Sequence, residues 1–63
     1  MYDHFRCIYE HDGSKTEIEG GFSGYPDDWQ TKTPLEKQAW WRERCLGWGM
    51  PADAKILRIW LAR

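Results

Sequence analysis

The sequence predicts one small α+β domain with the element order ββαβ, in which a three-stranded, mainly antiparallel sheet packs on a single helix. Three features predict it: an Asp12-Gly13 pair between two alternating segments, a Thr-Pro-Leu-Glu motif beginning at Thr33, and a run of strand formers near the end of the chain. The chain has 63 residues. It therefore has room for a single domain over residues 1–63 and for no second core.

Residues 3–22 are predicted to form a β-hairpin. Asp12-Gly13 suits a type I′ turn, because both central residues of that turn need positive φ. A two-residue turn places Cys7 opposite Ile18. The Gly20-Gly21 pair is expected to end the second strand or to introduce a bulge, since glycine weakens a strand interior. Period-two alternation assigns Phe5, Cys7, Tyr9, Thr16, Ile18 and Phe22 to the core face, and Arg6, Ile8, Glu10, Lys15, Glu17 and Glu19 to the outer face.

Residues 23–32 are predicted to form a loop that carries large aromatic side chains. The segment is rich in turn formers, yet it contains Tyr25 and Trp29. Such a loop either fixes its rings on the core or presents them to a ligand. A further alternative is that the loop folds across the outer sheet face and buries Arg58 and Trp60.

A helix of about four turns is predicted over residues 34–48. Thr33 and Glu36 have the spacing of a capping box, and Pro34 suits the first helical position because its missing N–H would be unpaired there. Gly47 or Gly49 is expected to end the helix.

The helix is expected to bury one apolar arc and to expose a tryptophan. At 100° per residue, the centre of the apolar arc falls between Leu35, Ala39 and Leu46. Trp40 lies away from that centre, on a face expected to be exposed, with Arg44 one turn later and within reach of a cation–π contact. The alternative is that the aliphatic stems of neighbouring side chains half-cover Trp40. The side chains that extend the arc are Cys45, Trp41 and Trp48.

Residues 55–62 are predicted to form the third strand. A right-handed crossover through the helix returns this strand parallel to the second strand, and therefore antiparallel to the first strand if it lies at that edge. The preferred sheet order is 2-1-3. Leu57, Ile59 and Leu61 are expected on the core face, and Ile56, Arg58 and Trp60 on the outer face.

The residues predict neither catalysis nor a bound metal or cofactor. His4, Cys7, His11 and Cys45 are the soft-ligand set, but Cys7 and His11 lie about 13 Å apart along one strand, which is too far for one zinc ion. Two cysteines are too few for a secreted disulfide scaffold, so two reduced, buried thiols are expected. The chain shows no apolar run of membrane-spanning length and no signal segment, so a cytoplasmic location and no membrane partner are expected.

The surplus of tryptophan indicates a binding protein. Five of the 63 residues are tryptophan, and a chain of this size buries only about 60% of the surface that its unfolded form exposes. Tryptophan and arginine are enriched at the centres of protein interfaces. The main hypothesis is a non-catalytic protein-interaction module that binds a larger protein, with the contact residues Trp40, Arg44, Trp60, Arg58, Glu17 and Glu19.

Charge is distributed unevenly and suggests a basic partner. Residues 1–30 carry seven acidic and two basic side chains, whereas residues 31–63 carry three acidic and seven basic side chains. An acidic hairpin of this kind would be attracted to a basic surface, unless the two halves fold together and their charges interleave.

The size and the hairpin–helix–strand layout resemble those of small phage-encoded inhibitors of host enzymes, including anti-CRISPR and anti-polymerase proteins. The resemblance extends to architecture and carries over no residue. It implies an inhibitor or adaptor that covers the basic surface of a nucleic-acid-handling protein such as a CRISPR effector, a nuclease or a polymerase.

Two alternatives remain open. The outer sheet face is expected to bind single-stranded nucleic acid in this alternative, by stacking and phosphate contact from Tyr2, Arg6, Arg58 and Trp60, although its acidic residues oppose a polyanion. A homodimeric structural domain would hide surplus tryptophan, for example by pairing the edge of the third strand with a second copy.

Overall fold

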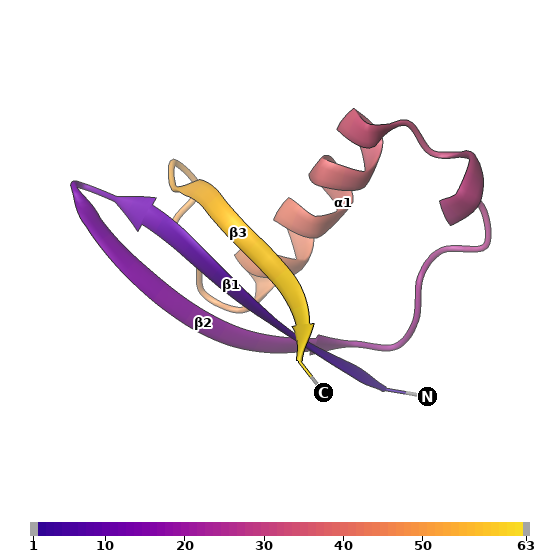
Figure 1. Ribbon diagram of the computed structural model, residues 1–63, viewed down its shortest axis with the longest axis horizontal. Coiled ribbons are helices and arrows are strands. Elements are labelled where there is room, and N and C mark those ends of the chain that lie inside the picture. The colour runs from indigo at the N-terminus through magenta and orange to yellow at the C-terminus, as the bar shows by residue number, and fades with distance from the viewer. Residues whose placement is uncertain (1, 63) are drawn as a thin grey trace.

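The computed structural model describes residues 2–62 and has the predicted ββαβ architecture (Figure 1). Strands β1 (Asp3–His11), β2 (Ser14–Phe22) and β3 (Lys55–Ala62) form a sheet of order β2-β1-β3, in which both outer strands run antiparallel to β1. Helix α1 (Pro34–Gly47) lies on one face of this sheet, and a short 3₁₀ helix η1 (Trp29–Thr31) precedes it. The predicted fold class and strand order are confirmed.

The hairpin has the predicted register along its whole length. Asp12 (φ 51°) and Gly13 (φ 79°) both have the positive φ of a type I′ turn, and Cys7 faces Ile18. The expected break at Gly20-Gly21 does not occur, because β2 continues in regular register to Phe22. The tip of the hairpin extends past the end of the helix (Figure 1), which explains why Thr16, predicted to be in the core, is exposed.

The core lies between β1, the end of β2 and the second half of α1. Phe5 and Cys7 are fully buried against Cys45 of the helix. Met50 and Ala54 are also buried, although they belong to the connection between α1 and β3, where the sequence predicted only a link.

Helix α1 begins as predicted and ends one residue earlier than predicted. The Thr33 hydroxyl accepts from the Glu36 N–H (3.2 Å), and the Glu36 carboxylate accepts from the Thr33 N–H (2.9 Å), which completes the capping box. At the other end, the Met50 N–H donates to the Cys45 carbonyl and Gly49 (φ 106°) takes the left-handed position. This is a Schellman motif, which stops the helix at Gly47.

The face of the helix that packs on the sheet differs from the predicted one. Leu35 is 77% exposed, and Leu46 and Ala39 are exposed as well. Trp41 and Cys45 pack on the sheet instead. Large rings decide the rotation of the helix, because the Trp41 ring meets the Phe5 ring at 5.6 Å and buries more apolar area than the smaller leucine and alanine side chains would.

Strand β3 contains a bulge that changes which of its side chains face the core. Ile8 faces Arg58 and Tyr9 faces Ile56, so Leu57 is the extra residue between these two pairs. Ile56 therefore packs against the core and Leu57 is exposed, the reverse of the prediction. Beyond the bulge, Ile59 and Leu61 lie on the core side as predicted.

The loop of residues 23–32 packs on the helix side of the molecule. The rings of Tyr25 and Trp29 are 4.6 Å apart, and both contact Trp40 and Trp41. The loop is thus fixed to the helix and leaves the outer sheet face uncovered. None of the helices in residues 2–62 combines the length and the apolar character that crossing a bilayer requires.

Candidate functional site

Trp40 lies in an aromatic cluster at the junction of the loop, β2 and α1. Its ring is 4.9 Å from Trp41, 5.1 Å from Trp29 and 5.4 Å from Phe22. The sequence left two alternatives for Trp40, exposed or half-covered, and the structure has the second: the side chain is half-buried and packs against the core. Aromatic rings cover it rather than the aliphatic stems that were expected. Trp40 is covered because the loop of residues 23–32 folds back over this face of the helix.

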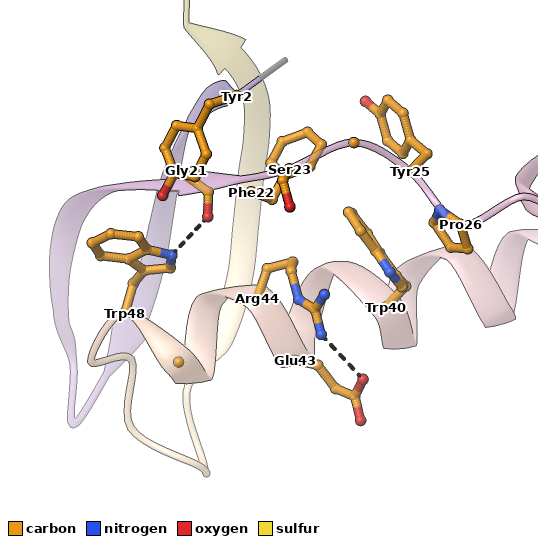
Figure 2. Close-up of a pocket in the computed structure, with 12 residues that line it drawn as sticks. Tyr2, Gly21, Phe22, Ser23, Tyr25, Pro26, Trp40, Glu43, Arg44 and Trp48 are labelled. Atoms are coloured by element: carbon orange, nitrogen blue, oxygen red, sulfur yellow. Dashed lines mark hydrogen bonds and ion pairs between the residues drawn. The ribbon is translucent and has the colours of Figure 1, made fainter.

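The cluster forms one wall of a surface groove of about 650 Å³ (Figure 2). The end of β2 and the start of the loop form one side, and helix α1 forms the other. Figure 2 shows Tyr2 and Trp48 at one end, Tyr25, Pro26 and Trp40 at the other, and Arg44 between them. The lining residues are Tyr2, Gly21, Phe22, Ser23, Gly24, Tyr25, Pro26, Trp40, Glu43, Arg44, Gly47 and Trp48.

Trp48 is held at the edge of β2 by a hydrogen bond, and it fits there because Gly20 has no side chain. The indole Nε1–H donates to the Gly21 carbonyl at 3.0 Å (Figure 2). A Cβ on Gly20 would lie 2.6 Å from the Trp48 ring, so the indole can occupy this place only over glycine. A Cβ on Gly21 would likewise collide with the ring of Tyr2. The two glycines that were expected to interrupt β2 therefore make room for one end of the groove.

Trp48 and Tyr2 also provide apolar surface that a partner can reach. Trp48 is 48% exposed and Tyr2 is 55% exposed. Trp48 was not among the predicted contact residues, and Tyr2, which was predicted on the outer sheet face, lines the groove instead. The signal that would have found Trp48 is the Gly20-Gly21 pair, because adjacent glycines in a strand mark a close approach of another group.

Arg44 supplies the hydrogen-bond donors of the groove. Its guanidinium lies over the Trp40 ring, 4.9 Å from the ring centroid, and one of its amino groups is 3.7 Å from the Glu43 carboxylate. The predicted Arg44–Trp40 contact is thus present. Arg44 lines the groove and its side chain stays partly exposed, so its guanidinium is available to an acceptor in the groove.

The other four predicted contact residues lie on the outer sheet face. Arg58 stacks on Trp60 at 4.7 Å. Arg6 bridges Glu17 (2.6 Å) and Glu19 (3.5 Å), and its hydrogen bond to Glu17 raises the pKa of the Arg6 guanidinium. The structure therefore divides the predicted site into two surfaces: Trp40 and Arg44 line the groove, whereas Trp60, Arg58, Glu17 and Glu19 lie on the outer face.

The outer face carries both signs of charge. The strand registers place Lys15 and Lys55 on either side of Glu10. Arg58 lies opposite Ile8, which is two residues from Glu10 along β1 and on the same face. With Glu17 and Glu19 bridged by Arg6, the face presents no extended area of one sign. The charges of the two chain halves interleave.

No known family, curated protein or solved structure matches the chain. The function is therefore inferred from the geometry of these surfaces.

The two thiols are enclosed in the core. Cys7 and Cys45 are free and fully buried. Burial raises the pKa of the Cys45 thiol to about 12 and raises that of Cys7 as well. Both side chains are thus protonated at neutral pH and poorly nucleophilic. Within residues 2–62, no three or more His, Cys, Asp or Glu side chains gather as they would around a metal ion.

Proposed function

We propose that this protein is a small, non-catalytic protein-binding module, and that its groove receives an apolar side chain from a segment of a partner protein. The observation that carries the proposal is the convergence of exposed aromatic surface on one groove: Trp48, Tyr2 and Tyr25 surround it, and Trp40 and Arg44 complete it. Aromatic and arginine side chains in one concave place are typical of the centre of a protein interface.

The shape of the groove favours a macromolecular partner. Its volume of about 650 Å³ is within the range of small-molecule sites, about 300–1,000 Å³, but such sites enclose 70–90% of their ligand. This groove is shallow and open along the surface. It suits one large side chain whose backbone remains outside, where Arg44 donates to a main-chain carbonyl or a carboxylate of the partner.

The narrower hypothesis, an inhibitor or adaptor that covers the basic surface of a nucleic-acid-handling protein, stays a prediction. It relied on Glu17 and Glu19 as an acidic face, and both are engaged by Arg6. The proposed protein-binding function depends on the groove and is independent of the outer sheet face. It includes a cytoplasmic location, which the two free thiols favour.

The alternative of single-strand nucleic-acid binding has less support. A base would have to stack on Trp60, but Arg58 already covers one side of that ring. The mixed charges of the outer face also provide little attraction for a polyanion.

A peptide-display selection tests the proposal. Peptides selected on the wild-type protein are expected to share an aromatic or large aliphatic residue, and Arg44→Glu is expected to weaken their binding about tenfold or more. Arg58→Glu is the matched control, because Arg58 also stacks on a tryptophan but lies on the outer face. Equal weakening by the two variants, or binding that ignores Arg44→Glu, would contradict the assignment to the groove.

A further inference from the structure

Strand β2 is a regular, open edge of the sheet. The order β2-β1-β3 gives the sheet two edges. The β3 edge, which the sequence suggested for pairing, is interrupted by the bulge at Leu57. Strand β2 has nine residues in unbroken register with β1, so it is the edge whose backbone is suited to pairing with another strand.

The antiparallel ladder determines which backbone groups of β2 point outward. A two-residue turn is closed by the hydrogen-bonded pair His11 and Ser14. Hydrogen-bonded and non-hydrogen-bonded pairs then alternate, so Lys15, Glu17, Glu19 and Gly21 direct their N–H and C=O groups away from β1. The Gly21 carbonyl confirms this alternation, because it accepts from Trp48. Within residues 2–62, no backbone hydrogen bond outside the ladder involves Lys15, Glu17 or Glu19.

We propose that β2 pairs antiparallel with β2 of a second copy of this chain, with Thr16 opposite Thr16 on the two-fold axis. The two three-stranded sheets then join into one continuous sheet. Lys15 of each copy lies opposite Glu17 of the other, and their outward N–H and C=O groups form the new ladder. Trp48 covers the edge from Gly20 onward and β2 begins at Ser14, so pairing extends over residues 14–18 and leaves both grooves open.

Charge selects this register over its neighbours. Centring the pair on Lys15 would put two lysines opposite each other, and centring it on Glu17 would put two glutamates opposite each other, which destabilises a sheet. Centring on Thr16 gives two Lys–Glu pairs and no like-charge pair. The same segment is thus its own complement, as an interface between two identical chains requires.

The pairing also covers side chains that the monomer leaves accessible. Thr16 is exposed and Ile18 is only half-buried, both on the helix side of β2. In the joined sheet, Thr16 gains a β-branched neighbour, and Ile18 gains a diagonal contact with Thr16 of the second copy. The dimer goes beyond the proposed function, because it presents two grooves to a partner.

Analytical ultracentrifugation over a range of concentrations tests this pairing. The wild-type protein is expected to dimerise, and Lys15→Glu is expected to raise the dimer dissociation constant about tenfold or more, because both charge pairs become repulsive. Lys55→Glu is the matched control: Lys55 faces Glu10 across the sheet as Lys15 does, but it lies on β3. A wild-type protein that stays monomeric, or equal effects of the two variants, would overturn the proposal.

A charge swap tests the register itself. Glu17→Lys alone is expected to weaken the homodimer as Lys15→Glu does, since four lysines then meet. An equimolar mixture of the two variants is expected to form a heterodimer, because each acidic position meets a lysine of the other chain. Near-ultraviolet circular dichroism verifies that each variant is folded, and a mixture of folded variants that remains monomeric would refute the Thr16 register.

The dimer test and the peptide test fail independently. Arg44→Glu is expected to leave the dimer dissociation constant unchanged, because Arg44 lies in the groove and outside residues 14–18. Lys15→Glu is expected to leave the affinity of each groove for its selected peptide unchanged.

Discussion

The molecule contains the same pair of side chains in two settings. Arg44 stacks on Trp40 at 4.9 Å, and Arg58 stacks on Trp60 at 4.7 Å. The first pair adjoins an aromatic cluster and a groove, whereas the second lies on an open sheet face among charges that are already paired. An arginine on a tryptophan therefore says little about function by itself. What surrounds the pair decides whether it stabilises the fold, lines a site or only covers a sheet.

The largest expected difference between the two settings is in stability. Trp40→Ala is expected to lower the free energy of unfolding by about 3 kcal/mol or more, because the ring packs in the cluster with Phe22, Trp29 and Trp41. Trp60→Ala is expected to cost about 1 kcal/mol, since its ring contact is with Arg58. Urea denaturation measures both, and equal losses would mean that the settings do not differ.

The two neighbouring glycines offer a second contrast. Gly20→Ala is expected to cost about 1–3 kcal/mol, because its Cβ would lie 2.6 Å from Trp48 and 2.8 Å from the buried Phe5 ring. Gly21→Ala is expected to cost less, because its Cβ meets the far end of Tyr2, an exposed side chain that can turn aside. Thermal unfolding of the two variants gives the order, and a larger loss for Gly21→Ala would contradict the positions of these rings.

The buried thiols predict a loss of stability in alkali. Burial raises the pKa of Cys45 from about 9 to about 12 in the folded protein. As the pH rises, the unfolded chain therefore releases this proton before the folded protein does. The contribution of Cys45 to the free energy of unfolding is constant below about pH 9 and falls as the pH rises from about 9 toward 12. Cys45→Ala is expected to flatten this part of the stability profile relative to wild type. An unchanged slope in that variant would show that Cys45 does not titrate as described.

The smallest expected effect is on the outer face. At concentrations where the protein is monomeric, Glu17→Gln removes a salt bridge whose two side chains are both exposed, and such bridges contribute little in water. We expect a slight fall in the melting temperature at low salt that disappears as salt is added. Comparison of the melting temperatures of the variant and wild type at several salt concentrations measures this effect. A large fall that does not depend on salt would mean that Glu17 contributes to stability as a buried residue does.

Local sequence features were enough to predict the secondary-structure elements and the register of the hairpin. The turn at Asp12-Gly13 sets the register of β1 and β2, and the capping box at Thr33 sets the start of α1. Both are determined by residues within a few positions of each other, so they can be predicted without knowing what packs on them. The crossover through α1 returns β3 parallel to β2, whereas the position of β3 beside β1 is decided by the packing of the assembled sheet.

The candidate site could be predicted only in part. Trp40 and Arg44 were predicted from the helix period, and they do line the groove. Trp48 was missed and Tyr2 was predicted on the outer sheet face, because what brings them to the end of β2 is the space above Gly20 and Gly21. Trp60 and Arg58 were assigned to the same site, and the fold puts them on the other face of the sheet.

Tertiary packing decided the features that connect distant segments. The sequence by itself determined the hairpin register, the helix start and the order of the elements, since these depend on short-range hydrogen bonds and backbone preferences. The rotation of α1 and the docking of the loop depend on how rings from residues 5, 22, 25, 29, 40 and 41 share one space. The bulge at Leu57 brings Ile56 to the core, which is likewise a matter of long-range packing. Such packing is a property of the assembled set, and no local pattern in the chain specifies it.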